Sequence, residues 1–227
     1  MSDAAPPLPP PTSAWHMYRA MVGIGLVCGL LIVTAFVVTG PSIRRNKAEA
    51  LQRAILTVVP AAHTARTFQL GDDGRFQPVA NAAPGAQVVY GAYDADGQLV
   101  GVAVEAQGMG YQDVIRILYG YAPARDAIVG LAVLDLRDTP GLGDRVEHDA
   151  QFLRNFEQLD VRLDADGAAL AHPLAPVKRG AKHEAWQVDT ITGATVTSSA
   201  VAGMLRDSAA VWIPRISRHL ADLERQE

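Results

Sequence analysis

Cysteine is almost absent from this chain. The 227 residues contain a single cysteine, Cys28. One thiol cannot form a disulfide within the chain, and zinc sites built from two or more cysteines are excluded for the same reason. The six histidines are scattered, and none lies at ligand spacing from another. The sequence therefore predicts no protein metal site.

An excess of positive charge is missing as well. Lysine and arginine together number 20 against 24 acidic residues, which gives a formal net charge of -4 at pH 7. A protein that binds nucleic acid attracts its phosphates with a positive field. This balance offers no such field, so we expect no nucleic-acid partner.

Charged side chains are absent from residues 20–38, which are almost wholly apolar. A helix of this length approaches the thickness of the hydrocarbon layer of a membrane. Trp15 and Tyr18 lie just before it, where aromatic belts occur. The apolar run is longer than the 7–15 residues usual in a cleaved signal peptide. We predict an uncleaved transmembrane helix over residues 18–40, after a disordered proline-rich tail over residues 1–17.

Basic residues flank this span unequally. Arg19 precedes it, whereas Arg44, Arg45, Lys47 and Arg53 follow it. The positive-inside rule alone would place the C-terminal part of the chain in the cytoplasm.

The remainder of the chain has the pattern of one α+β domain. A juxtamembrane helix is expected over residues 41–60, ended by Pro60. Residues 61–227 then alternate between runs rich in valine and turn sequences such as Asp-Ala-Asp-Gly at 94–97. These runs predict a mostly antiparallel sheet with packed helices. The expected strands are residues 88–93, 98–106, 114–121 and 127–136, and the expected helices are residues 148–159 and 197–213.

Hydroxyl side chains are concentrated in residues 189–199, which read Asp-Thr-Ile-Thr-Gly-Ala-Thr-Val-Thr-Ser-Ser. Serine and threonine before an apolar run are typical helix caps. Gly193 gives the backbone freedom and permits close approach of another group. The free N–H groups at the start of a helix, and its positive dipole end, favour an anion such as phosphate. The alternative interpretation is a capped helix start after a tight turn.

A second dense turn occupies residues 138–144, with the sequence Asp-Thr-Pro-Gly-Leu-Gly-Asp. Proline restricts the backbone here and two glycines permit unusual angles. One interpretation is a plain connector. The functional interpretation is a loop that lies against a flat ligand, with small residues that permit close approach.

Together with the single N-terminal span, these two motifs resemble the FMN-binding G subunit of the Rnf electron-transport complex. The related C subunit of the sodium-translocating NADH:quinone reductase shares the second motif. The resemblance covers roughly residues 20–213. It implies FMN esterified through its phosphate to Thr195, which follows Gly193 and Ala194, by a separate flavin transferase. The family usually has Ser or Thr at Thr192.

The resemblance also implies the surroundings of the cofactor. Thr197 and Ser198 are expected to donate hydrogen bonds to the phosphate, and the loop residues Thr139, Gly141, Leu142 and Gly143 to cover the flavin. Covalent FMN would carry electrons, so no residue of the chain is expected to be catalytic by itself.

The implied setting is a single-pass protein of the inner membrane whose soluble domain is periplasmic, against the positive-inside rule. Its partners would be the other membrane subunits of an Rnf-type complex, which couples ferredoxin–NAD electron transfer to cation movement. Two alternatives remain open. One is a non-redox, membrane-anchored binding or scaffold module, and the other is the FMN-binding domain of another membrane reductase.

Overall fold

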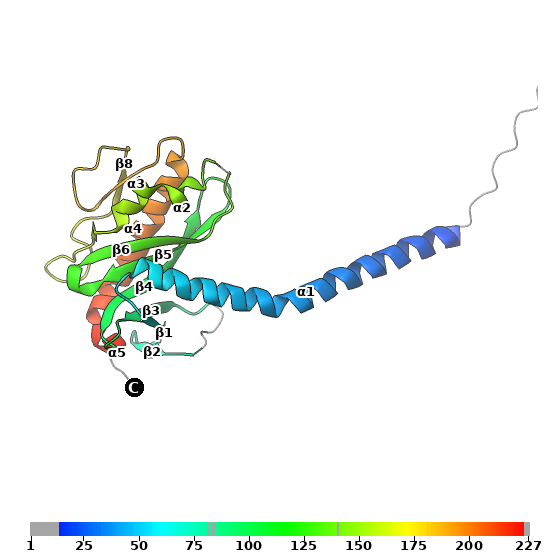
Figure 1. Ribbon diagram of the computed structural model, residues 1–227, viewed down its shortest axis with the longest axis horizontal. Helices are drawn as coiled ribbons and strands as arrows, with labels where there is room; N and C mark the ends of the chain where they lie inside the picture. The colour runs from blue at the N-terminus through cyan, green and yellow to red at the C-terminus, as the bar shows by residue number, and fades with distance from the viewer. Residues whose placement is uncertain (1–13, 81, 83–84, 140, 225–227) are drawn as a thin grey trace, which may run out of the picture. The chain divides into compact units, whose positions relative to one another are not determined.

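A computed structural model describes residues 14–224 of the chain, apart from residues 81, 83–84 and 140 (Figure 1). Residues 1–13 of the predicted disordered tail lie outside the described residues, and the prediction is wrong for residues 14–17, which are helical. The chain divides into two compact units, residues 1–49 and residues 50–227. Each unit is described by itself.

One long helix, α1, spans Ala14–Val58 and includes Pro41. It contains a window with a mean hydropathy of 2.7, apolar enough by length and composition to cross a membrane. The ranges predicted separately as membrane span and juxtamembrane helix thus belong to one continuous helix. It ends at Val58, two residues before Pro60, because the residue before a proline is pushed out of helical geometry.

Seven strands form an antiparallel sheet in the order β2-β1-β3-β4-β5-β6-β7. The four predicted strands form its centre, which confirms a mostly antiparallel α+β fold. Three outer strands, β1, β2 and β7, were not predicted. The strands are β1 Thr64–Leu70, β2 Phe76–Pro78, β3 Val88–Tyr93, β4 Leu99–Met109, β5 Val114–Ala122, β6 Ala127–Asp135 and β7 Leu159–Asp160.

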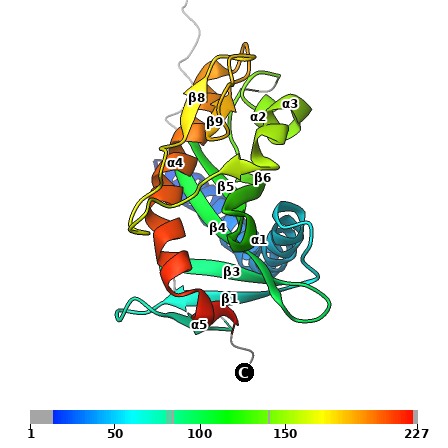
Figure 2. The same ribbon diagram turned by 90° about the vertical axis from the view of Figure 1, so that its left-hand side faces the viewer.

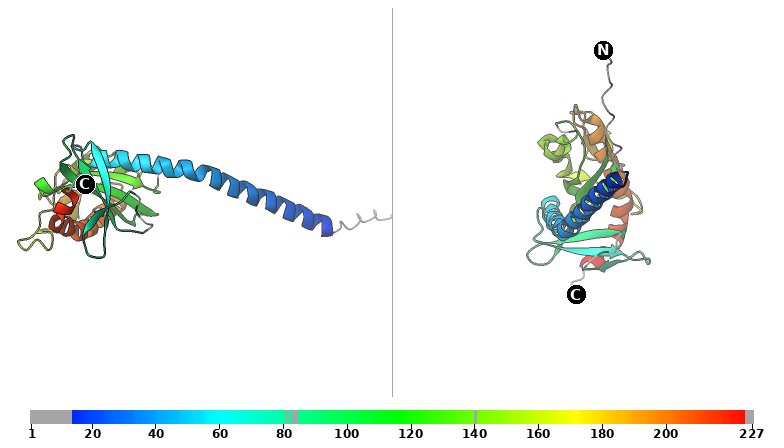
Figure 3. Two further views of the ribbon diagram at one scale, coloured as in Figure 1. Left: turned by 90° about the horizontal axis from the view of Figure 1, so that it is seen from below. Right: turned by 90° about the vertical axis from the view of Figure 1, so that its right-hand side faces the viewer.

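Helices cover both faces of this sheet. On one face lies α4, which spans Thr195–Arg218, and on the other lie the last turns of α1 (Figures 2 and 3). Side chains of β4 alternate between the two cores: Val102 and Val104 pack with α4, and Ala103 packs with the end of α1. This alternation follows from the two-residue period of a strand.

Close approach of α1 to the sheet depends on two glycines. Gly120 on β5 and Gly130 on β6 are paired across the sheet. A Cβ atom at either position would overlap the backbone carbonyl of Val58. Glycine is therefore required here, because the helix end packs directly on the strand backbones.

The helix predicted over residues 148–159 is confirmed only for residues 150–156. The structure has three short helices instead, α2 Arg145–His148, α3 Ala150–Leu153 and η2 Arg154–Phe156, followed by β7. The chain is extended at Asp149, whose carboxylate caps α3 by accepting from the N–H groups of Gln151 and Phe152. The cap at Asp149 therefore lies one residue after the predicted start, and the helical segment that it begins ends at Phe156.

The last helix is longer than predicted. It begins at Thr195 rather than at 197 and passes through Pro214 to Arg218, before the short α5, Leu220–Glu224. A separate parallel pair, β8 Ala175–Val177 and β9 Gln187–Asp189, leads into the start of α4. A single turn, η1 Pro123–Arg125, joins β5 to β6.

Candidate functional site

The two sequence motifs meet at one carboxylate. Thr197 Oγ1 on α4 donates to Asp138 Oδ2 at 2.6 Å. The backbone N–H of Thr139 donates to the other oxygen of Asp138 at 2.7 Å. The loop over residues 138–144 is thereby attached to the first turn of α4, at the end of the domain where β8, β9, α2 and α3 gather (Figure 2). Pro140 of this loop lies outside the described residues.

Hydrogen bonds within the loop close a compact turn. The N–H groups of Leu142 and Gly143 both donate to the carbonyl of Thr139, each at 3.1 Å. Gly141 has φ +80°, and a Cβ at Gly143 would overlap the carboxylate of Asp138. Glycine is needed at both places for different reasons. The Leu142 side chain is 51% exposed, so the loop presents an apolar group to solvent.

The turn before α4 does not have the cap expected from its hydroxyl residues. The N-cap is Ala194, which makes no side-chain capping bond. Gly193 has φ +87°, and the N–H of Ala194 donates to the carbonyl of Ile191 at 3.0 Å. The prediction of a serine or threonine N-cap is therefore wrong. Thr195 occupies the first helical position, where backbone N–H groups have no partner within the helix.

Three hydroxyls of the motif are buried and bonded inside the protein. Thr190, Thr197 and Ser198 are 6%, 2% and 0% exposed. Ser198 Oγ donates to the carbonyl of Ala194 at 2.8 Å and accepts from the N–H of Ile191 at 3.0 Å. Thr197 and Ser198 were expected to donate hydrogen bonds to a phosphate. Their buried positions do not suit that role. They hold the turn and the loop together instead.

The other side of the same turn faces solvent. Thr192 and Thr195 are exposed, and the neighbouring Val196 side chain is 58% exposed. Thr195 Oγ1 has only a long hydrogen bond, 3.3 Å, to the carbonyl of Ile191. Thr195 therefore presents an accessible hydroxyl in the first turn of a 24-residue helix.

Arg145 contacts this turn and was not identified from the sequence. Its Nη1 donates to the carbonyl of Thr192 at 2.8 Å and lies 3.5 Å from where a Cβ on Gly193 would be. Its Nη2 lies 3.4 Å from Asp149 Oδ2. Arg145 comes two residues after Gly143 in the chain, so its place beside the loop was visible in the sequence. Its contact with the turn before α4 could not be predicted from the sequence.

Asp149 lies between two guanidinium groups. Arg179 Nη1 is 3.3 Å from the oxygen that also faces Arg145. Burial of the carboxylate raises the pKa of Asp149, but the N–H donors of Phe152 and Gln151 and the two arginines outweigh this. The net effect is a pKa below the ordinary value for aspartate.

Asp189 shapes the segment that leads into the motif. Its Oδ1 accepts from the N–H groups of Gly180 and Lys182, each at 3.1 Å. Its backbone N–H donates to the Asn155 side-chain oxygen, and its carbonyl accepts from the Asn155 side-chain nitrogen. This residue therefore positions β9 and the preceding loop.

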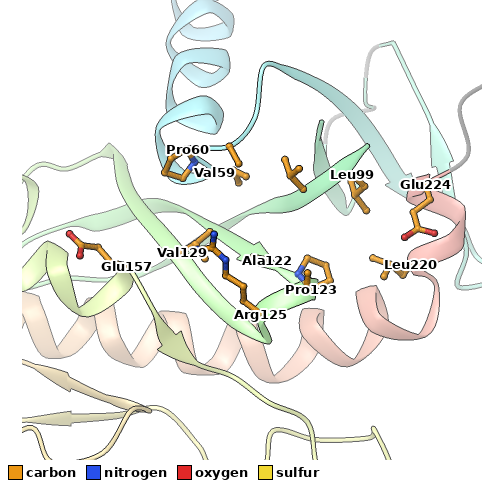
Figure 4. Close-up of a pocket in the computed structure, with 13 residues that line it drawn as sticks. Val59, Pro60, Leu99, Ala122, Pro123, Arg125, Val129, Glu157, Leu220 and Glu224 are labelled. Atoms are coloured by element: carbon orange, nitrogen blue, oxygen red, sulfur yellow. The ribbon is translucent and has the colours of Figure 1, made fainter. Parts of the chain in front are cut away.

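Two hollows lie near the sheet, and neither contains the motif hydroxyls. A groove of about 500 Å³ lies between β4 and α4 and is lined in part by Met109, Gly203 and Trp212. A larger cavity of about 750 Å³ lies at the other end of the domain, between residues such as Leu99 and Leu220 (Figure 4). None of the described residues that line the larger cavity is serine or threonine, so it offers no hydroxyl for a phosphoester.

Comparison with known proteins identifies the family of the chain. Residues 110–210, which include both motifs, match the family model described as FMN-binding domain. The chain is 30% identical over 226 residues to the G subunit of the ion-translocating oxidoreductase complex of Cereibacter sphaeroides, covering 97% of this chain and 94% of that relative. The chain belongs to this G-subunit family. The family resemblance of its two motifs is thereby confirmed.

A further relative and two solved structures extend the comparison. The G subunit of the same kind of complex from Methanosarcina acetivorans is 27% identical over 194 residues, covering 83% of this chain and 88% of that one. The crystal structure of NqrC from Shewanella oneidensis matches 79% of this chain and 98% of its own, with a TM-score of 0.59 and 21% identity. The crystal structure of the C subunit of the Na⁺-translocating NADH-quinone reductase from Parabacteroides distasonis matches 81% of this chain and 96% of its own. Its TM-score is 0.57 and its identity 20%. These two structures share the fold of this G-subunit chain.

Proposed function

We propose that this protein is a membrane-anchored, electron-carrying flavoprotein with FMN attached through its phosphate to Thr195. Membership of the G-subunit family and the match to the FMN-binding domain support the cofactor. One observation carries the choice of residue. Thr195 presents an exposed hydroxyl in the first turn of α4, whereas Thr197 and Ser198 are buried and bonded internally.

The residues around Thr195 suit such a group. The N-terminal end of α4 favours a negatively charged phosphate. Leu142 in the attached loop and Val196 next to Thr195 expose apolar side chains, and these would shield an aromatic ring from water. Thr192, Gly193 and Ala194 would form the backbone turn beside the phosphate. When bound, FMN supplies reversible electron transfer, which the side chains here do not.

The proposed loop contacts follow from the attachment of the loop to α4. Asp138 holds residues 139–143 against the helix that would carry the flavin. Thr139, Gly141 and Gly143 would act through their compact backbone, and Leu142 through its exposed side chain. This division explains why one large apolar residue, Leu142, lies between two glycines in the loop.

We further propose that the protein works in the inner membrane as one component of an ion-translocating oxidoreductase complex. The relatives carry that name, and α1 contains a window apolar enough to span a bilayer. In this proposal residues 1–17 precede the span, with 14–17 already helical. The span is residues 18–40, the juxtamembrane segment is residues 41–60, helical to Val58, and residues 61–227 are a periplasmic FMN-binding domain. The complex would pass electrons between ferredoxin and NAD.

Covalent attachment by a flavin transferase fits a periplasmic location, because freely bound FMN would be lost outside the cytosol. Protease added to cells whose outer membrane has been opened, while the inner membrane stays sealed, tests the orientation. We expect the domain to be digested. A domain that stays intact until the inner membrane is opened would contradict the periplasmic assignment and agree with the basic residues that follow the span.

Intact mass tests the attachment directly. The full chain, made in a host that contains a flavin transferase, is expected to carry the mass increment of an FMN phosphoester and to fluoresce after denaturing electrophoresis. Thr195→Ala should lose both signals. Ser199→Ala, which removes a hydroxyl from the same segment, should keep both.

Two outcomes would oppose the proposal. A fluorescent band that persists in Thr195→Ala would place the flavin elsewhere. An unmodified mass for the unaltered chain in that host would favour the non-redox scaffold module.

A further inference from the structure

We propose that Arg145 is a positioning residue that binds the phosphodiester linking FMN to Thr195. This inference rests on the proposed function, because it requires a phosphate at that residue. It adds a residue outside both sequence motifs and assigns it a defined ligand chemistry.

The first support is the place of the guanidinium. Arg145 Nη1 donates to the carbonyl of Thr192 at 2.8 Å. Nη1 also lies 3.5 Å from the position that a Cβ on Gly193 would occupy. Among the described residues, no other atom outside Gly193 and its two neighbours in the chain lies within 4 Å of that position. The guanidinium therefore lies over the two residues of the turn that precede Ala194 and Thr195.

The second support is the number of donors that Arg145 keeps available. An arginine side chain has five N–H donors in a planar fork. The carbonyl of Thr192 accepts one donor at 2.8 Å, and Asp149 Oδ2 accepts a longer hydrogen bond from Nη2 at 3.4 Å, which leaves three donors. A phosphodiester has two unesterified oxygens that share one negative charge. Paired donors of arginine suit such a group better than they suit a single carbonyl.

The third support is that Arg145 shares its carboxylate partner with a second arginine. Arg145 and Arg179 share the single carboxylate of Asp149. Arg179 also donates to the amide oxygen of Gln151 through two of its nitrogens. Asp138, which contacts the same helix turn through Thr197, has both oxygens occupied by hydrogen bonds within the protein. Two guanidinium groups therefore contact one carboxylate, which leaves Arg145 able to bind a further anionic oxygen such as that of a phosphodiester.

The test compares two arginines that share Asp149 but differ in their contact with the turn. Arg145→Gln, Arg145→Lys and the control Arg179→Gln are made in the full chain, with a flavin transferase present. Intact mass gives the fraction that carries FMN. Phosphorus NMR gives the environment of the phosphodiester, and thermal unfolding gives the stability gained on loading relative to Thr195→Ala.

In the unaltered chain and in Arg179→Gln, loading should raise the unfolding temperature. Arg145→Gln should lose roughly 3–6 °C of that gain, as expected for the loss of a hydrogen bond to a charged group. Its phosphorus resonance should move toward that of a solvent-exposed phosphodiester. Arg145→Lys should recover part of both signals, because it keeps the charge but not the paired donors.

The outcomes separate this inference from the proposed function. If loaded Arg145→Gln matches Arg179→Gln in stability gain and phosphorus resonance, Arg145 does not bind the phosphate, while the flavin assignment stands. If the unaltered chain carries no FMN, the proposed function fails first. If Arg145→Gln does not fold, Arg145→Lys decides, because a phosphorus resonance unchanged from the unaltered chain would overturn the proposal.

Discussion

The first turn of α4 carries hydroxyl side chains on two sides, one buried in the protein and the other exposed to solvent. Thr197 and Ser198 face the protein interior, and Thr195 and Val196 face solvent. Consecutive helix positions are rotated by about 100°, so hydroxyls two positions apart point in different directions. The comparison teaches that a run of hydroxyl residues is not one functional group. The buried side builds the turn and the exposed side is available for chemistry.

Replacing a buried hydroxyl of this turn by an apolar side chain should give the largest effect on stability. Ser198→Val removes the acceptor of the Ile191 N–H and adds a methyl group at a fully buried position. We expect a loss of about 3 kcal/mol in the free energy of unfolding. The mirror change, Val196→Ser on the exposed side, should stay within about 0.5 kcal/mol. Denaturant titration of the full chain in detergent measures both, and equal costs would contradict the comparison.

Breaking the link between loop and helix should cost less. Thr197→Val and Asp138→Ala each remove one partner of the 2.6 Å bond. Each is expected to lower the free energy of unfolding by about 2 kcal/mol, because a hydrogen bond to a charged group is lost. A double-mutant cycle should give a coupling energy of about 1–2 kcal/mol between the two residues.

Thr197→Val also sharpens the assignment of the flavin. It should still carry the FMN mass, since the hydroxyl of Thr195 is untouched. A coupling energy near zero would mean that the loop is not held by this bond. Loss of the FMN mass in a folded variant would transfer the attachment site to the buried side of the turn.

The smallest expected effect concerns pH. The folded pKa of Asp149 lies below its ordinary value, which is near 3.9 in an unfolded chain. Its contribution to stability is therefore present at neutral pH and is lost as the pH falls through about 4 and below. Asp149→Asn keeps a residue able to cap α3 but removes the charge beside Arg145 and Arg179.

We expect Asp149→Asn to cost about 1 kcal/mol or less at pH 7. The difference from the unaltered chain should shrink as the pH is lowered from about 5 to about 3. Unfolding titrations at several pH values measure this. A difference that stays constant with pH would show that the carboxylate charge adds nothing.

The central strands were predictable because their signals are local. The strand expected over residues 88–93 is β3, Val88–Tyr93, and the turn at 94–97 leads into β4. Valine-rich runs between turn sequences carry this information without long-range help. The outer strand β1, Thr64–Leu70, has few buried side chains and exists through pairing with β3 and β2. Pairing of that kind leaves little trace in one segment of sequence.

The site was predictable only in part. Both motifs were visible, and the family they resemble is confirmed. The bond from Thr197 to Asp138 joins residues 59 positions apart, and the bond from Arg145 to Thr192 spans 47 positions. Neither spacing has a sequence pattern, so the partners of the motif were missed. The helix expected over residues 148–159 is shorter for a similar reason, because Leu159 pairs with Ile128 in the sheet instead of continuing the helix.

The amino-acid sequence by itself determined the elements that depend on neighbouring residues: the apolar helix, the central strands, the two glycine-containing turns and the order of the hydroxyl residues. Only the tertiary structure decided which hydroxyl reaches solvent and which is buried. Helix rotation sets their directions, but the sheet and the loop over residues 138–144 decide which direction is the interior. Burial is a property of what packs against a side chain, and that is set by residues far away in the chain.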